Sequence, residues 1–383
     1  MRSLPILLAA LVAAGPALAA KPPPAPPVLP IDAGPDAYRE RLATYGDRDR
    51  VLNQMEIGAR SFWKGDHAAS KAALDDAIGQ IGAVFGSNPD AAKARQLWYD
   101  EGSKTFKGEP YERAMVFLYR GLGYLRDGDF ENARAAFRQG QMQDAFAEES
   151  QNRADFGLLV FLEAWASHQN GDEDLRDQAL EQLKKLRPDY PGIGKDHDTL
   201  VLIETGTSPR KLGDGLDHSY FVYRRGKTIA ANGAEVIKAG QPIAAYRMED
   251  IYWQASTRGG REVDKILQGK AQFKAGTGAV GSVLADGVSA YNDVAGASTA
   301  GAAVGAVAGV FLIVSSSTKP QADTRYWSSL PDAVHVLTFA SKGKPPPLSA
   351  RFLKDGQPAA TPETPIACES FETRKHLCLA RAY

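Results

Sequence analysis

Hydrophobic residues recur every three or four positions from Tyr38 to about Tyr190, which is the spacing of one buried helix face. Alanine, leucine, glutamate, arginine and glutamine dominate this stretch, and Pro89 and Pro110 are its only prolines between residues 36 and 187. The pattern therefore predicts a helical domain over residues 36–195.

The clearest unit in this domain is Ala114 to Gly140, AMVFLYRGLGYLRDGDFENARAAFRQG. Small residues let two helices cross closely, large residues fill the space around the crossing, and a Gly-Asp pair makes the turn. The order of these residues resembles the signature of a tetratricopeptide repeat, here Phe117, Gly121, Tyr124, Gly128, Ala133 and Phe137. Weaker copies cover Glu56 to Ile81 and about 160–188, and their irregular spacing predicts a degenerate array with an insertion near 88–112.

Helix pairs of this kind stack and leave a concave surface that commonly binds peptides or partner proteins. We expect the aromatic residues of the repeats to pack in the core. A partner-binding role for Tyr111 and Tyr119 is the alternative, and it requires that these two side chains are exposed.

After Pro191 the pattern changes to short alternating or apolar runs separated by turn residues, as in antiparallel strands. These runs lie at about 198–226, 234–256 and 335–383. They predict a small antiparallel β module over residues 196–383, interrupted by a Gly/Ala-rich helical insertion at about 263–316. The expected fold class is α+β, with an N-terminal α-solenoid of helical hairpins followed by the β module.

The insertion contains GAAVGAVAGVFLIV, in which Gly301, Gly305 and Gly309 fall on one helical face. Its dense apolar part, residues 300–314, is shorter than the about 20 residues that a membrane-spanning helix needs. A preceding stretch of similar small residues predicts a helical hairpin over 276–316 that packs through the glycines. Such a hairpin either packs within a water-soluble protein or inserts into a membrane, and a flexible linker is the third alternative.

The chain begins with the pattern of a secretory signal peptide over residues 1–20, with a basic start, a short apolar stretch and cleavage near Ala19 or Ala20. No cysteine follows the apolar stretch, so lipid attachment is not indicated. A proline-rich linker, residues 21–35, comes next. These features predict an exported, periplasmic protein.

Cys368 and Cys378 are the only cysteines and lie ten positions apart. In an oxidising compartment this spacing predicts a disulfide that closes a hairpin. The alternative is a pair of free buried thiols.

Chemical motifs are scarce in this chain. The 45 basic and 46 acidic residues balance, so the charge does not indicate a nucleic-acid partner. GTGAVG at 276–281 matches G-x-G-x-x-G but lacks the preceding strand of a dinucleotide site. The acid–histidine groups at 196–198 and 217–218 have no visible converging ligands. We therefore expect no cofactor, no metal and no catalytic residue, and keep a hydrolase or cell-wall enzyme as the minor alternative.

Three stretches resemble the signature blocks of an uncharacterised family of bacterial exported envelope proteins, whose members have a helical-repeat N-terminal half and a β-rich C-terminal half. They are Lys107 to Gln139, Leu200 to Lys211 and Ala322 to Phe339. Many members of that family resemble lipoproteins, and this chain departs from them by lacking the lipid-attachment cysteine. The resemblance implies an envelope setting and a role with outer-membrane or cell-wall assembly machinery.

These observations together predict a non-enzymatic exported adaptor or scaffold that binds a protein partner in the cell envelope through the concave face of its repeats. The alternative is a membrane-associated component of an outer-membrane secretion or pore complex that uses the hairpin 276–316. No oligomeric state is predicted.

Overall fold

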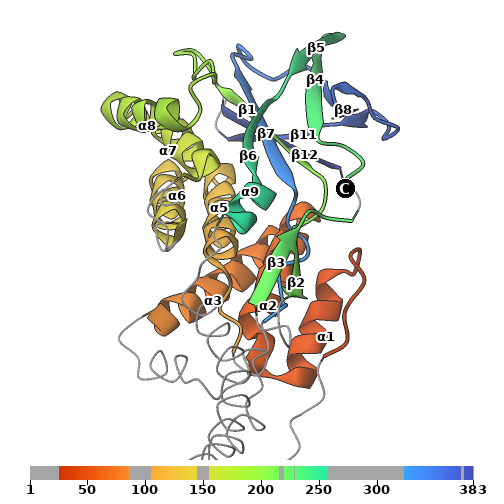
Figure 1. The fold of residues 1–383 in the computed structure, drawn as a ribbon. Helices are drawn as coiled ribbons and strands as arrows, with labels where there is room; N and C mark the ends of the chain where they lie inside the picture. Colours follow the sequence, from red (N-terminus) through yellow and green to blue (C-terminus); the bar gives the residue numbers. More distant parts are fainter. Residues whose placement is uncertain are drawn as a thin grey trace, which may run out of the picture.

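The computed structural model describes residues 26–85, 105–144, 155–214, 220–227, 229–257, 323–371 and 375–382. Within these ranges the chain combines helices and sheets, which confirms the α+β class (Figure 1). The predicted signal peptide 1–20 and the whole insertion 263–316, with Gly301, Gly305 and Gly309, lie outside the described residues.

The helices of the N-terminal half pack against one another in chain order. They are α1 (Pro35–Tyr45), the short η1 (Asp47–Asp49), α2 (Arg50–Trp63), α3 (His67–Phe85), α5 (Pro110–Arg126), α6 (Phe130–Asp144), α7 (Gly157–Asn170) and α8 (Glu173–Leu186). Gly65, Gly128 and Gly171 make the turns within the pairs α2–α3, α5–α6 and α7–α8, and each takes a left-handed φ between 75° and 82°.

A five-stranded central sheet packs on this helical layer, with the strand order β11-β12-β1-β7-β6. Its strands are β1 (Thr199–Thr205), β6 (Tyr246–Asp250), β7 (Ala333–Phe339), β11 (Ala367–Phe371) and β12 (Lys375–Ala382). Neighbouring strands are antiparallel except for β1 and β12, which run parallel. The predicted all-antiparallel module is therefore wrong at this pair. Most of the β module separates β1 from β12 in the sequence, so no tight turn forces them to be antiparallel.

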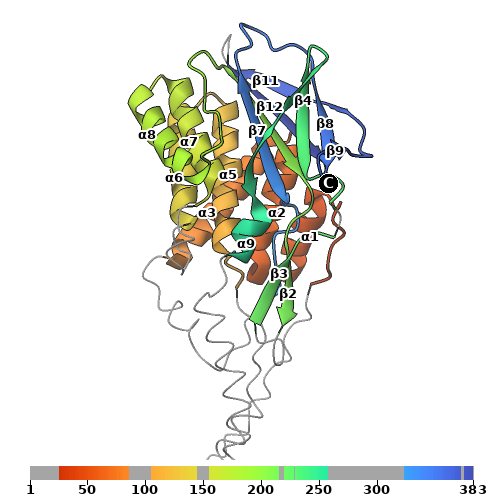
Figure 2. The ribbon, with the colours of Figure 1, turned by 45° about the horizontal axis from the view of Figure 1, so that its top comes forward.

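An outer sheet covers the other face of the central sheet (Figure 2). Its strand order is β10-β8-β4-β5, and β9 also pairs with β8. Its strands are β4 (Gly233–Lys238), β5 (Gln241–Ala244), β8 (Leu348–Lys354), β9 (Gln357–Pro358) and β10 (Thr364–Pro365). A separate hairpin of β2 (Arg210–Asp214) and β3 (Tyr220–Arg224) and the short helix α9 (Ile251–Ser256) complete the described elements.

Strand β1 is buried along its whole length because it lies in the middle of these three layers. Leu200 and Leu202 belong to the core shared with the helices, whereas Val201 and Ile203 belong to the core between the two sheets. This explains why the strand is a continuous apolar run rather than an alternating one.

The disulfide Cys368–Cys378 is present, as predicted. The two cysteines are register partners on β11 and β12, with their Cα atoms 4.0 Å apart, so the bond closes the hairpin of these adjacent strands. It fits a chain that folds in an oxidising compartment.

Part of the proline-rich linker is held on the helices. Leu29 and Ala33 pack against the cluster around Ile57, and Arg60 of α2 donates hydrogen bonds to the carbonyl oxygens of Ile31 and Ala33 at 2.8 and 2.7 Å. The last residues of this segment are therefore docked on α2 and do not act as a free tether.

Candidate functional site

Tyr111 and Tyr119, the candidate partner-binding residues, are fully buried. The Tyr111 ring packs edge-on against Tyr223 of β3, and the Tyr119 hydroxyl donates a hydrogen bond to Glu204 of β1 at 2.7 Å. The expected core packing therefore holds for both rings, and the alternative of an exposed, partner-binding pair is wrong, because α5 is enclosed between its neighbouring helices and the β elements.

The six repeat-signature residues lie where the α5–α6 pair packs. Ala133 and Phe137 are fully buried, and Gly121 lies directly against the Phe137 ring, where an added Cβ would be 2.7 Å from Cζ. Phe117 is buried, and Gly128 forms the turn. Tyr124 is half-buried under the Arg120 guanidinium, whose Cζ is 3.7 Å from the ring centroid.

A buried polar junction surrounds Trp327, which precedes β7 and is fully buried. Glu112 of α5 accepts a hydrogen bond from the Trp327 backbone N–H at 2.7 Å, and the Ser208 hydroxyl donates to the Trp327 carbonyl oxygen at 2.7 Å. Glu56 of α2 accepts from the N–H and hydroxyl groups of Ser328 at 2.7 and 2.6 Å. Two helix carboxylates thus hold an irregular segment of backbone whose donors would otherwise be buried without partners.

The same junction contains a buried ion pair. Lys211 of β2 approaches Glu109 at 2.7 Å, and both side chains are almost completely buried. Glu112 also accepts the Glu109 backbone N–H at 2.7 Å, which caps the start of α5. Burial raises the pKa of Glu112 to about 7, while the nearby Lys211 charge opposes the rise.

The three stretches that carry the family resemblance meet at this junction. Lys107 to Gln139 supplies Glu109 and Glu112, Leu200 to Lys211 supplies Ser208 and Lys211, and Ala322 to Phe339 supplies Trp327. The polar residues of these stretches therefore join the helical layer to the β elements.

A second junction lies between β1 and the helices. Glu204 is fully buried, accepts the Tyr119 hydroxyl and pairs with Arg381 of β12 at 3.2 Å. Arg381 lies over the Trp63 ring at 5.4 Å and donates to the Ser329 carbonyl oxygen. Burial raises the pKa of Glu204, and the Arg381 charge opposes this effect.

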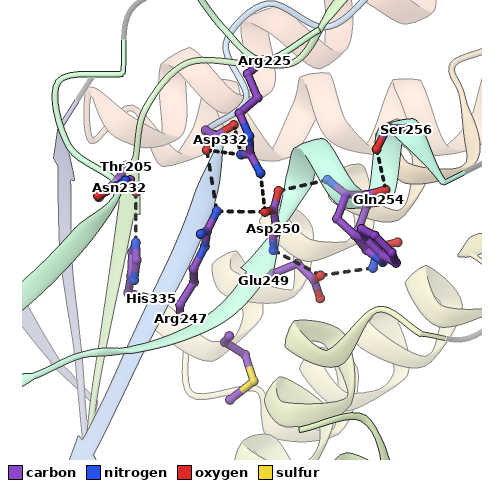
Figure 3. A network of polar contacts seen from close by, with 12 residues as sticks. Thr205, Arg225, Asn232, Arg247, Glu249, Asp250, Gln254, Ser256, Asp332 and His335 are labelled. Atoms are coloured by element: carbon purple, nitrogen blue, oxygen red, sulfur yellow. Dashed lines mark hydrogen bonds and ion pairs between the residues drawn. The ribbon is translucent and has the colours of Figure 1, made fainter. Parts of the chain in front are cut away.

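Figure 3 shows a third junction, at the ends of β6 and β7. Arg225, which follows β3, donates to both carboxylate oxygens of Asp332 at 2.7 and 2.6 Å and to Asp250 at 2.7 Å. Arg247 donates to the same oxygen of Asp250 at 2.9 Å. One guanidinium thus joins the end of β6 to the residue just before β7.

Glu249 and His335 lie beside this group and are buried. Glu249 accepts from Arg187 and Gln254 at 3.1 Å each and from the Leu158 N–H at 3.2 Å, and burial raises its pKa to about 7. His335 pairs with the Thr205 hydroxyl at 3.0 Å, and burial lowers its pKa to about 3. Both side chains connect layers of the protein and face no solvent.

A surface pocket of about 210 Å³ lies between α3 and α5, beside the end of α2. Phe62, Leu74 and Tyr119 lie beneath it and are at most 4% exposed. Its charged lining residues are His67, Lys71, Arg120, Arg126 and Asp127. Four basic side chains thus face one acidic side chain within the lining.

The basic side chains of the pocket are partly engaged by acids around it. Arg120 pairs with Asp75 at 2.7 Å and Arg126 with Asp127 at 2.7 Å. Glu369 of β11 approaches His67 at 3.5 Å and Arg126 at 3.8 Å. The Arg126 Nε atom is buried and donates no hydrogen bond within the described part of the chain.

Sequence reasoning missed this pocket. His67 and Lys71 are four residues apart on α3, so they lie on one helix face, and Arg120 and Arg126 come from the following pair. The spacing of His67 and Lys71 indicates one basic helix face in the sequence. Only the packing of α3 against α5 shows that this face lies beside Arg120 and Arg126.

No family model, curated protein or solved structure matches this chain. Within the described ranges, no group of three or more potential metal ligands occurs, and no helix has the length and apolar character to cross a membrane. The stretch 276–316, for which a membrane role was the alternative, lies outside those ranges and stays a prediction.

Proposed function

We propose that this chain is a non-enzymatic binding protein, an exported adaptor that holds a protein partner in a bacterial envelope assembly. The observation that carries the proposal is the pocket between α3 and α5, whose lining at the protein surface is mainly basic. A lining of this kind suits recognition of a peptide better than chemistry on a substrate.

The buried acids support a binding role over catalysis. Glu56, Glu112, Glu204 and Glu249 are at most 1% exposed, and each accepts hydrogen bonds from neighbouring groups of the protein. A general acid or base must come within hydrogen-bond reach of a substrate. These four carboxyl groups instead join the helices to the β elements.

The place of binding differs from the one expected for a repeat array. The helices α2 and α5 direct Glu56, Glu112 and Tyr119 at the β elements, so this face of the helical layer is occupied by the protein's own chain. We propose that the helix pairs are degenerate tetratricopeptide-like repeats whose partner binds in the α3–α5 pocket, in a periplasmic setting.

Crosslinking in intact cells tests this proposal. A lysine-reactive crosslinker followed by affinity recovery of the chain should capture a reproducible envelope protein, with crosslinks near Lys71. Recovery of the chain without any reproducible crosslinked protein, under conditions that capture a known envelope complex, would count against an adaptor function.

A further inference from the structure

The hairpin of β2 and β3 has one face against the protein and one face toward solvent. Lys211 of β2 pairs with Glu109, and both side chains are almost completely buried, so this face of β2 points inward. Side chains alternate along a strand, so Arg210, Leu212 and Asp214 lie together on the other face. Leu212 is 41% exposed and Asp214 is also exposed, which makes this outward face accessible to a partner.

The edge of β2 that faces away from β3 has no partner strand within the described residues. The two strands form a sheet of their own, and no backbone hydrogen bond joins residues 210–213 to a described segment other than β3. Figure 2 shows the hairpin at the end of the molecule away from the outer sheet. An edge strand presents a row of backbone N–H and C=O groups, so a further strand can pair with β2 here.

Arg210 lacks an acidic neighbour on the outward face. It lies directly across from Arg224 of β3, and like charges at opposite positions destabilise a sheet. Its Nε atom donates to the carbonyl oxygen of Arg225 at 3.1 Å, but no carboxylate of the described residues pairs with it. An acidic side chain on a strand added beside β2 would offset the repulsion between the two guanidinium groups.

The sequence of β2, Arg-Lys-Leu-Gly-Asp, contains that acidic side chain. When two copies of β2 lie side by side and antiparallel, with Leu212 opposite Leu212 of the second copy, each Arg210 lies opposite an Asp214. The outward face then carries two opposite-charge pairs around a central leucine pair. An in-register parallel arrangement instead places Arg210 beside Arg210, so the charges select the antiparallel arrangement.

We propose that the free edge of β2 pairs with the same strand of a second copy of this chain, across a two-fold axis at Leu212. A contact of this kind uses the same surface on both copies and closes on itself. A strand of 5 residues gives a small interface, so the dimer is weak and forms as the protein concentration rises. The proposal goes beyond the adaptor function, and the contact shares no residue with the lining of the α3–α5 pocket.

Sedimentation of the purified chain over a range of concentrations tests the proposal. The original chain should show a dimer fraction that rises with protein concentration and falls with added salt. Arg210→Asp and Asp214→Arg should each weaken self-association about tenfold or more, because both opposite-charge pairs become like-charge pairs at once. The matched control Lys185→Glu, which reverses an exposed charge on α8, should leave self-association unchanged.

An equimolar mixture of the two charge variants shows whether the two strands meet. Opposite charges face each other again when an Arg210→Asp chain pairs with an Asp214→Arg chain, so the mixture should regain the dimer that neither variant forms alone. Regained dimer also shows that both variants are folded. A monomeric original chain at every concentration, or a dimer that both variants retain, would overturn the proposal.

A cysteine at the two-fold axis tests the register without changing any charge. In Leu212→Cys the two introduced thiols lie opposite each other, so mild oxidation should link two copies of the chain. Val222→Cys, which lies across from position 212 on β3 and therefore one strand away from the axis, should give no linked product. Linked product from position 222 with none from position 212 would contradict the proposed pairing.

The adaptor function does not depend on this contact. If the chain is monomeric but captures an envelope protein by crosslinking, the strand pairing fails and the adaptor function stands. If the dimer forms and no envelope protein is captured, the adaptor function fails and the strand pairing stands.

Discussion

Gly121→Ala should destabilise the protein, although alanine is the better helix former. A Cβ at this position would lie 2.7 Å from Cζ and 2.8 Å from Cδ1 of Phe137, well inside the about 3.5–4.0 Å of normal carbon contacts. Phe137 is fully buried, so its ring cannot move aside without displacing α5 from α6. Overpacking of a core typically costs about 1–3 kcal/mol, and this severe overlap belongs at the upper end. The helix-propensity gain of about 1 kcal/mol offsets part of it and leaves a net loss of about 2 kcal/mol.

Gly79→Ala is the matched control for this substitution. Gly79 lies within α3, is exposed, and has no atom within 4 Å of an added Cβ. The same chemical change should therefore stabilise the protein by about 0.5–1 kcal/mol. Urea unfolding followed by circular dichroism measures both variants, and Phe137→Leu should remove most of the Gly121→Ala penalty in a double-mutant cycle. A Gly121→Ala variant as stable as the original chain, or a penalty that persists with Phe137→Leu, would refute the packing argument.

Three further predictions concern pH, the disulfide and the insertion. Burial raises the pKa of Glu249 in the folded protein to about 7, above the ordinary 4.5, so the folded protein binds this proton more tightly than the unfolded chain and its stability falls as the pH rises from 4.5 to 7. Glu249→Gln should make this loss of stability smaller by at most about 3 kcal/mol, measured by urea unfolding at both pH values. A variant with the same pH dependence as the original chain would contradict this. Reduction of the Cys368–Cys378 disulfide, whose cysteines lie 10 positions apart, should lower the free energy of unfolding by about 3 kcal/mol. The stability of a Cys368→Ala/Cys378→Ala variant should not change with reductant. An equal loss of stability in both proteins would show that the disulfide is not the cause. If the Gly/Ala-rich segment packs within the protein, as the sequence predicts, deleting residues 295–316 should lower the melting temperature and leave the chain releasable by osmotic shock. If the deletion instead moves the chain from membranes to the soluble fraction, the membrane alternative is favoured.

Local sequence patterns predicted the elements that depend on neighbours in the chain. The glycine–aspartate turn at 128, a strand at the start of the run predicted from about residue 198, and the cysteine pair all appear where their patterns placed them. Each is decided by a local backbone need, by continuous burial or by a short loop, and those requirements are visible in a few consecutive residues.

The same patterns could not show what covers a helix. The sequence leaves open whether Tyr111 and Tyr119 are exposed and bind a partner. In the fold, Tyr223 and Glu204, about a hundred positions away in the sequence, contact them and bury them. The sequence likewise does not show that the charged residues Glu112 and Lys211 are buried. Glu112 is buried with the backbone N–H of Trp327 as its partner, and Lys211 with the carboxylate of Glu109. The pocket was missed for the same reason, since its basic groups come from two helix pairs.

The most direct test of the account places a photo-crosslinking amino acid at Lys71, on the pocket, and separately at Glu181, on the exposed face of α8, in intact cells. A partner that binds in the α3–α5 pocket should give one discrete crosslinked product from position 71 and none from position 181. A product from position 181 with none from position 71 would contradict the proposed binding site.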